Sequence, residues 1–278
     1  MTTQSIWNSF SNPISYPALN GNITVDTAII GGGITGLATA MKLAQAGQRV
    51  VVLEALKIGG GSTSHSTGNL YSTVDTKLQD LESKYGKDVV KQIVQARQKA
   101  VEQIAGYVAQ YNIDCDFHRQ DFYMYGTEEN RDLVEKEAKT AEDLGMQISF
   151  TSVAELPISN VFGFKLHHQA QFNPMRFIQG FSVEVAKHCQ VFENTKVEDI
   201  NESDGKYELA TARGIVTAKH VVHATHTPKG IKLWHTLLGP YREYGIACRV
   251  RNLQHPEGIF WGFHGEKRDK FSTRTYTR

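Results

Sequence analysis

The spacing of hydrophobic positions changes several times along this chain, and each change predicts the start of a new element. The run VDTAII, which begins at Val25, is short, apolar and rich in β-branched residues, as in a buried strand. The next segment, GGGITGLATAMKLAQAG, has apolar residues at helical spacing, and QRVVVLEA is a second apolar run. This order predicts a strand, helix, strand unit.

The rest of the chain continues to alternate between helical and strand-like patterns, which predicts an α/β fold, α+β overall. The expected elements are an irregular arm over 1–22, helices over 73–112 with a break near Tyr85–Gly86, a strand over 116–126, a helix from near Thr127, a helix over 174–189, a strand over 190–200, a hairpin over 206–216, a strand over 220–225 and further strands over 241–278.

Three glycines with the spacing GxGxxG, at Gly31, Gly33 and Gly36, connect the first strand to the first helix. In this context the first glycine allows a tight turn, the second lets a pyrophosphate approach the backbone, and the third lets helix and strand pack closely. The N–H groups of Ile34 and Thr35 lie at the helix N-terminus, whose dipole favours phosphate. The turn therefore predicts a Rossmann-like dinucleotide site.

An acid follows the second strand at Glu54, where a carboxylate accepts hydrogen bonds from ribose hydroxyls and disfavours a 2′-phosphate. The turn and this acid do not by themselves separate FAD from NAD. The run that follows, ALKIGGGSTSHSTGNLYS, is dense in small and hydroxyl residues, and a plain NAD-binding unit seldom needs such a loop. We expect it to line a cofactor's phosphates and ribityl chain, with donors and close-approach positions at Ser62, Thr63, Ser64, His65, Thr67 and Gly68.

Four segments together resemble the D-amino acid oxidase superfamily of FAD enzymes, which includes glycine oxidase, sarcosine and dimethylglycine dehydrogenases and γ-glutamylputrescine oxidase. The segments are VDTAIIGGGITGLATAMKLAQAGQRVVVLEA, GGGSTSHSTGN, FNPMRFIQGF, and TKVEDI with HVVHATHTPKG. The resemblance covers residues 25–75 and 170–230 well, and it extends to Rieske-linked bacterial relatives. It implies FAD as the cofactor and a Rossmann-like FAD-binding domain interleaved with a mixed-sheet substrate domain.

The resemblance also implies domain boundaries and further cofactor contacts. The FAD-binding segments would be 1–75 and 166–230, the cap or substrate region 76–165, and the first substrate-domain strands 231–278. Val197 would contact adenine through its backbone, and Ala224 and Thr225 would line the cofactor's edge. Two positions depart from the family pattern, because Asn173 replaces the usual Asp before Pro174 and His226 replaces the usual glycine.

The sequence leaves two alternative roles open for His65. The run STSHSTG is similar to the segment of dimethylglycine and sarcosine dehydrogenases in which a histidine attaches covalently to FAD. In the other reading the histidine hydrogen-bonds the cofactor or a backbone carbonyl.

The family implies oxidation of an amine or amino acid at a C–N bond, by hydride transfer to the flavin and with oxygen or a carrier as electron acceptor. Aromatic and basic residues of the last predicted strands are the candidates for substrate contact. The catalytic candidates are Tyr244 and Arg274, and Trp261 and Tyr276 are further candidates for substrate contact. Arg274 could pair with a substrate carboxylate.

Composition narrows the partners. Lysine and arginine number 30 against 29 acids, so no strong field attracts nucleic acid, and we expect a small-molecule substrate. Three separated cysteines without CxxC spacing argue against a disulfide framework and against a metal site, and no apolar run is long enough for a transmembrane segment. Together with an N-terminus that lacks a leader pattern, these features favour a cytoplasmic protein.

The sequence ends at FSTRTYTR, before the Gly-rich turn and helix that complete the flavin site in relatives. We therefore expect a C-terminal part to be missing, either because the chain is a fragment or because a partner supplies that part. The alternative to an active oxidoreductase is a truncated, non-catalytic or partner-dependent remnant of such a flavoprotein. A nicotinamide-dependent dehydrogenase is disfavoured by the hydroxyl-rich loop.

Overall fold

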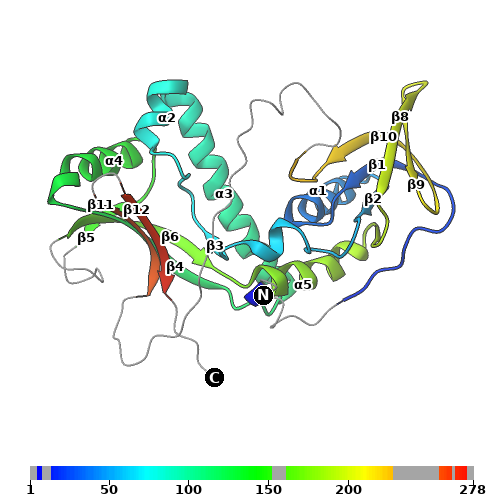
Figure 1. The fold of residues 1–278 in the computed structure, drawn as a ribbon, viewed down its shortest axis with the longest axis horizontal. Helices are drawn as coiled ribbons and strands as arrows, with labels where there is room; N and C mark the ends of the chain where they lie inside the picture. Colours follow the sequence, from blue (N-terminus) through cyan, green and yellow to red (C-terminus); the bar gives the residue numbers. More distant parts are fainter. Residues whose placement is uncertain (1–4, 8–13, 152–160, 228–256, 265–266, 274–278) are drawn as a thin grey trace. The chain divides into compact units, whose positions relative to one another are not determined.

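The computed structural model describes residues 5–7, 14–151, 161–227, 257–264 and 267–273. It divides the chain into two compact units, each assembled from separate stretches of sequence. The first unit comprises Met1–Thr67, Tyr111–Cys115 and Asn173–Ala247, and the second comprises Gly68–Gln110, Asp116–Phe172 and Cys248–Arg278. Figure 1 shows both units with their elements labelled.

The first unit is built on a six-stranded sheet in the order β7-β2-β1-β10-β9-β8. Its elements are β1 (Ile23–Ile30), α1 (Ile34–Gln45), β2 (Val50–Leu53), the 3₁₀ helix η2 (Ser62–His65), α5 (Pro174–Ala186), β7 (Gln190–Phe192), β8 (Val197–Ser203), β9 (Lys206–Thr211) and β10 (Gly214–His223). Strand β1 pairs in parallel with β2 and β10, and β10, β9 and β8 form an antiparallel meander. The predicted strand, helix, strand start is confirmed, as is the α/β class.

The expected strand over 190–200 is two strands, β7 and β8, at different places in the sheet. The chain turns between them at Asn194, whose φ is +49°, and the neighbouring Glu193 side chain is drawn into the interior. Conversely, the expected hairpin arm and the strand over 220–225 join into one strand, β10. The first difference arises because β7 pairs with β2 whereas β8 pairs with β9, and the second because β10 pairs with β1 along its length. Local sequence pattern does not reveal these pairings.

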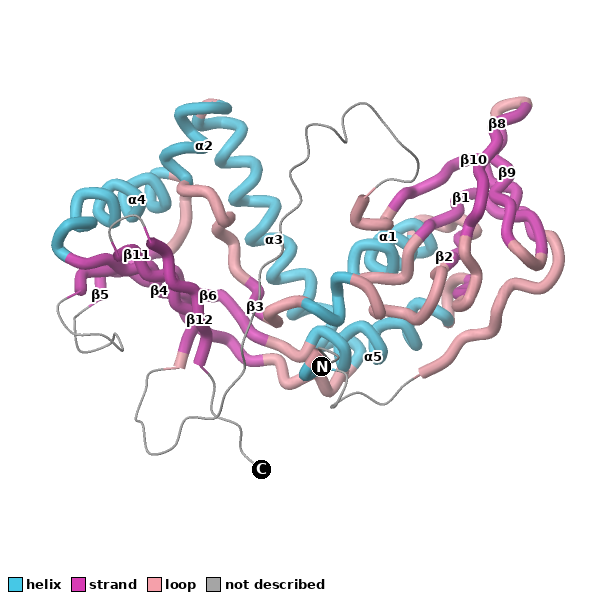
Figure 2. Tube along the Cα trace, in the orientation of Figure 1, coloured by secondary structure: helices cyan, strands magenta, loops and turns pink. Residues whose placement is uncertain are grey.

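The second unit is a mixed sheet with helices against one face (Figure 2). The strand order is β12-β11-β4-β6-β3, with β5 paired to β6, and β11 runs parallel to β4. The elements are β3 (Asn69–Leu70), α2 (Leu78–Tyr85), α3 (Lys87–Tyr111), β4 (His118–Thr127), η3 (Glu128–Asn130), α4 (Arg131–Asp143), β5 (Ile148–Thr151), β6 (Val161–Gln171), β11 (Gly258–His264) and β12 (Lys267–Thr273). The predicted helix break is confirmed at Gly86, whose φ is +83°.

Alternate residues of the second sheet form the core of this unit. Phe122, Met124, Phe164, Leu166 and Trp261 are buried together against α2, α3 and α4. Burial of each such side chain contributes about 1.5–3 kcal/mol, so this cluster accounts for much of the unit's stability. In the described part of the chain, no helix is both long enough and apolar enough to cross a bilayer.

Candidate functional site

Three parallel strands of the first unit end side by side. Ile30 of β1 is in register with Leu53 of β2 on one side and with His223 of β10 on the other. The residues that follow these strand ends are the glycine turn, Glu54 and Ala224. Ligands of open α/β sheets bind outside the carboxyl ends of the strands, where neighbouring connections leave in opposite directions. The predicted cofactor residues therefore meet at the position where such a fold binds its ligand.

The outer glycines of the turn are required by close backbone contact. Gly31 has φ +111°, a conformation that L side chains rarely adopt, and a Cβ there would lie 2.5 Å from the Ala224 carbonyl oxygen. A Cβ on Gly36 would overlap the carbonyl oxygen of Gly31. These two glycines bring β1, α1 and the end of β10 into direct contact, and a larger residue at either position would push them apart.

The N-terminus of α1 opens from this turn. Gly33 is the N-cap, and no side chain caps the helix from that position. Among the next residues, the Ile34 N–H lies 3.4 Å from Thr63 Oγ1, while Thr35 is exposed. The first N–H groups of a helix have no partner within the helix, and together with the dipole they form an anion site. The arrangement suits a pyrophosphate.

Glu54 is held firmly by the same turn. Its two carboxylate oxygens accept the N–H of Gly32 at 2.7 Å and the N–H of Leu56 at 2.9 Å. A carboxylate has about four acceptor positions, so both oxygens keep capacity for a further donor such as a ribose hydroxyl. The side chain is half-buried and directly follows β2, the position in the chain that the sequence predicted.

The hydroxyl-rich loop is joined to the glycine turn by a backbone hydrogen bond of 3.0 Å from Gly59 N to Gly32 O. Within the loop, the Ser64 hydroxyl is buried and donates to backbone carbonyls of the loop, 2.9 Å from Gly61 O. Ser64 therefore stabilises the loop and is not turned outward, whereas Ser62 and Thr67 are exposed. Gly68 has φ +75°, which explains why glycine stands there.

His65 lies at the end of η2 and is exposed. Its Nδ1 is 3.1 Å from Gly61 O and 2.9 Å from Ser64 Oγ. These contacts agree with the expectation of a histidine that bonds a backbone carbonyl. Both contacts are made by Nδ1, and neither involves Nε2.

The two departures from the family pattern have local explanations. Asn173 caps α5, because its Oδ1 accepts the N–H groups of Met175 at 3.0 Å and Arg176 at 3.1 Å, and Pro174 occupies the first turn. Asn therefore performs the capping task of Asp. His226 has φ +65°, the left-handed conformation in which a glycine is unstrained, so the backbone keeps the shape that the usual glycine allows.

The remaining cofactor candidates lie on the β10–β8 side of the first sheet. Ala224 donates its N–H to Ile30 O at 2.8 Å, which fixes the end of β10 against β1. Thr225 follows it and closes a short turn with Thr227 at 2.7 Å. Val197 begins β8 and is buried in the same core cluster as Leu53.

Sequence patterns did not single out Glu193, a buried carboxylate beside this site. It accepts from Lys57 Nζ at 2.6 Å, from Ile58 N at 2.8 Å and from Tyr16 N at 3.2 Å, so it holds the loop after β2 and the N-terminal arm together. Burial opposes ionisation, but the hydrogen bond from Lys57 and the two backbone N–H groups outweigh it and lower the pKa of this carboxyl.

Of the four substrate candidates, Trp261 alone lies among the described residues. Tyr244, Arg274 and Tyr276 lie outside the described residues. Trp261 is 5% exposed and packs edge-on against Phe122 and Tyr71 in the core of the second unit. Its role is therefore to fill that core.

Known proteins share this architecture. The chain is 26% identical over 261 residues to YhfW of Bacillus subtilis (strain 168), named as a candidate Rieske 2Fe-2S iron-sulfur protein, covering 92% of this chain and 51% of YhfW. It is 28% identical over 225 residues to gamma-glutamylputrescine oxidoreductase of Escherichia coli (strain K12), covering 78% and 53%. The chain spans about half the length of these curated relatives.

Similarity of fold extends to solved structures. The L-proline dehydrogenase from P. horikoshii superposes with a TM-score of 0.64 at 18% identity, covering 90% of this chain and 65% of that one. The family described as FAD dependent oxidoreductase, DAO, matches residues 26–273, which is most of the chain and includes the glycine turn, Glu54 and the hydroxyl-rich loop. The chain belongs to the DAO family of FAD-dependent oxidoreductases.

Proposed function

We propose that this chain binds FAD at the carboxyl ends of β1, β2 and β10 and serves the oxidation of an amine or amino acid at a C–N bond. The observation that carries the proposal is the convergence of Gly31, Glu54 and Ala224 at three strand ends that are in register. The name of the Escherichia coli relative, which specifies γ-glutamylputrescine, supports an amine as the substrate class.

Each part of the site has a proposed task. The α1 N-terminus at Gly33 to Gly36 would bind the pyrophosphate, because its N–H groups and dipole favour negative charge. Glu54 would accept the ribose hydroxyls, and the 3.0 Å bond between Gly59 and Gly32 would keep the second loop beside the phosphates. Val197 and Ala224 would border the cofactor through their backbones. The turn keeps this close geometry because neither glycine carries a Cβ, which on Gly31 would meet the backbone of Ala224 and on Gly36 the backbone of Gly31.

FAD, when bound, supplies a two-electron acceptor for the hydride that the carbon beside the substrate nitrogen gives up. The chain's own contribution would be to position the cofactor, and the hydrogen bonds of Glu54 to the N–H groups of Gly32 and Leu56 support this because they fix the segments that follow β1 and β2. Arg274 is proposed as the partner of a substrate carboxylate and Tyr244 as a second substrate contact. Oxygen or a carrier would take the electrons, and the rate of flavin reoxidation in air distinguishes the two.

Anaerobic bleaching of the FAD-loaded chain tests the proposal. Amines and amino acids are compared with hydroxy acids of the same shape, for example alanine with lactate and glycine with glycolate. Bleaching by a nitrogen compound and not by its oxygen counterpart supports C–N oxidation. Bleaching by the hydroxy acids alone contradicts it. A flavin that dithionite reduces but no amine bleaches points to the non-catalytic or partner-dependent alternative.

A further inference from the structure

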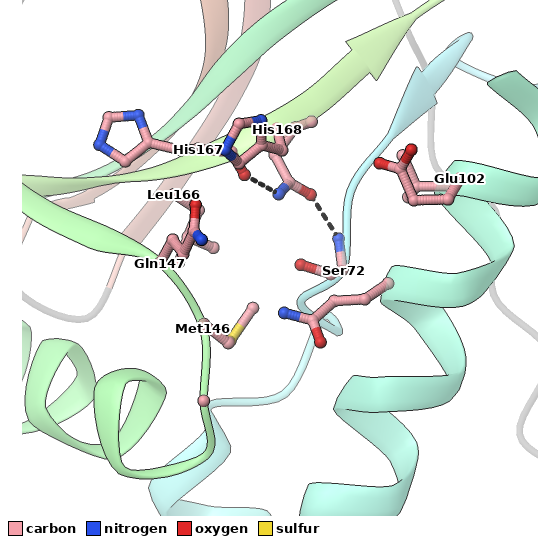
Figure 3. A pocket seen from close by; sticks show the side chains of 11 residues that line it. Ser72, Glu102, Met146, Gln147, Leu166, His167 and His168 are labelled. Atoms are coloured by element: carbon pink, nitrogen blue, oxygen red, sulfur yellow. Dashed lines mark hydrogen bonds between the residues drawn. The ribbon is translucent and has the colours of Figure 1, made fainter.

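The second unit contains a hollow of about 230 Å³, and none of its lining residues belongs to the proposed cofactor residues (Figure 3). Helix α3, the segment after β3, the turn between α4 and β5 and the end of β6 form its walls. Its lining residues are Ser72, Gln98, Val101, Glu102, Gly145, Met146, Gln147, Leu166, His167, His168 and Gln169.

An irregular stretch of β6 shapes one wall. The pairing of β4 with β6 shifts register between Gln120 and Phe122, a β-bulge, and His168 opposite has φ +63°. Bulges and left-handed non-glycine residues occur often beside binding sites, where they re-aim side chains. Here the irregularity directs Gln169 inward, and its amide accepts Ser72 N–H at 2.7 Å and donates to His167 O.

The Gln169 side chain bonds the backbone of Ser72 but leaves the Ser72 hydroxyl without a partner. Ser72 is 1% exposed, and within the described structure its hydroxyl has no hydrogen-bond partner. Figure 3 shows the hydroxyl turned toward the hollow, which Met146 and Gln147 border from the opposite side. A buried hydroxyl without a partner is unfavourable, and a ligand or an ordered water in the hollow would supply the missing hydrogen bond.

The other lining groups define the chemistry of the ligand. Gln98 and Gln147 offer carboxamides, which both donate and accept, while Met146 and Leu166 offer apolar surface. The one lining carboxylate, Glu102, is already paired with Arg119 by bonds of 2.9 and 2.7 Å.

Of the two lining histidines, His168 is exposed, and His167 is engaged at both ring nitrogens. Its Nδ1 lies 3.2 Å from Asp121 Oδ1 and its Nε2 lies 2.9 Å from Ser149 Oγ. With the acid paired and this imidazole occupied, the hollow favours an uncharged ligand, because an unpaired charge would lose its hydration there.

We propose that this hollow binds a small uncharged molecule with a planar carboxamide, whose amide group meets Ser72 and the two glutamines and whose apolar part packs on Met146 and Leu166. Pockets for drug-sized ligands measure about 300–1,000 Å³, so this hollow fits a single ring. A ligand of that size binds in the range of roughly 0.1–1 mM.

Nicotinamide is the probe, and nicotinate, which has the same shape but a negative charge, is the matched control. Both are titrated into the full chain with ¹³C-methyl methionine, and the Met146 resonance is assigned by its loss in Met146→Leu. Nicotinamide is expected to shift the Met146 methyl and to leave that of Met41 in α1 unmoved, whereas nicotinate shifts neither. The absence of any Met146 shift, or a shift of Met41 in its place, would overturn the proposal.

Ser72→Ala separates ligand binding from folding. It is expected to weaken nicotinamide binding roughly fivefold or more while leaving the melting temperature unchanged, because no intramolecular hydrogen bond is lost. The control is Ser182→Ala, a buried serine with partners at Gln179 O and the Tyr16 hydroxyl, which should lower the melting temperature. Unchanged nicotinamide affinity in Ser72→Ala, or a destabilisation equal to that of Ser182→Ala, would refute the assignment.

Discussion

The third glycine of the turn offers the sharpest perturbation of the cofactor site. Gly36→Ala adds one methyl group at a position where it overlaps the Gly31 carbonyl oxygen. Non-bonded heavy atoms keep roughly 3.5–4.0 Å between centres, so α1 must move away from the end of β1 by more than about 1 Å. This displacement falls on the N–H groups proposed to bind the pyrophosphate.

The size of the effect follows from two opposing terms. Overpacking costs about 1–3 kcal/mol, and the higher helix propensity of Ala returns up to about 1 kcal/mol. The net loss is therefore up to about 3 kcal/mol, a drop in melting temperature of up to about 12 °C. Hydrogen bonds to charged groups contribute about 1.5–3 kcal/mol each, so losing even one should weaken FAD binding about tenfold or more.

Thermal denaturation of the cofactor-free chain and titration of FAD by fluorescence quenching measure the two effects. Gly106→Ala in α3 is the matched control, because a Cβ there has open space around it. The control should be neutral or stabilising by about 0.4–1 kcal/mol and should bind FAD normally. If Gly36→Ala binds FAD as tightly as the parent chain, the glycine turn is not the pyrophosphate site.

Three further outcomes follow from individual contacts. Asn173→Ala should destabilise the chain by about 1 kcal/mol through loss of the α5 cap, and Asn173→Asp should retain stability; chemical denaturation compares them. The pKa of Glu193 is lowered in the folded chain, so its ionised carboxylate stabilises the fold above the ordinary glutamate pKa, and this contribution is lost as the pH falls through the pKa of the folded state. Glu193→Gln should therefore make the free energy of unfolding depend less on pH in the acidic range. Burial raises the pKa of Cys189 to about 11, so iodoacetamide at mildly alkaline pH should alkylate it only after denaturation, and rapid labelling of native protein would disprove this.

The glycine turn could be predicted from sequence because all its determinants are local. The spacing of apolar residues changes from strand-like to helical at Gly31, and the acid that follows β2 lies within the same strand, helix, strand unit. The prediction of β1, α1 and β2 therefore required no knowledge of distant contacts. The pairing of β10 with β1 involves residues far apart in the chain. Only the resemblance, through the HVVHATHTPKG segment, indicated that Ala224 belongs beside the turn.

Several features could not be predicted from local sequence pattern, because they depend on contacts between residues far apart in the chain. Glu193 accepts from Ile58, 135 positions earlier, and an isolated glutamate in FENTKV carries no sign of that role. Ser72 is fixed by Gln169 across 97 positions. The sequence pattern did not predict strand β6. Gly163 and the pair His167–His168 interrupt the alternation of apolar and polar residues that is typical of a strand.

The visible absorbance spectrum of the purified chain, recorded after incubation with FAD and desalting, shows whether this chain binds the cofactor, because a bound flavin absorbs visible light. Oxidised-flavin bands are expected to remain with the parent chain and to be weaker in Gly36→Ala. Acid precipitation then separates the two readings of His65, because full release of the chromophore eliminates a covalent bond. A parent chain that stays colourless after incubation with FAD would contradict the assignment of the cofactor site.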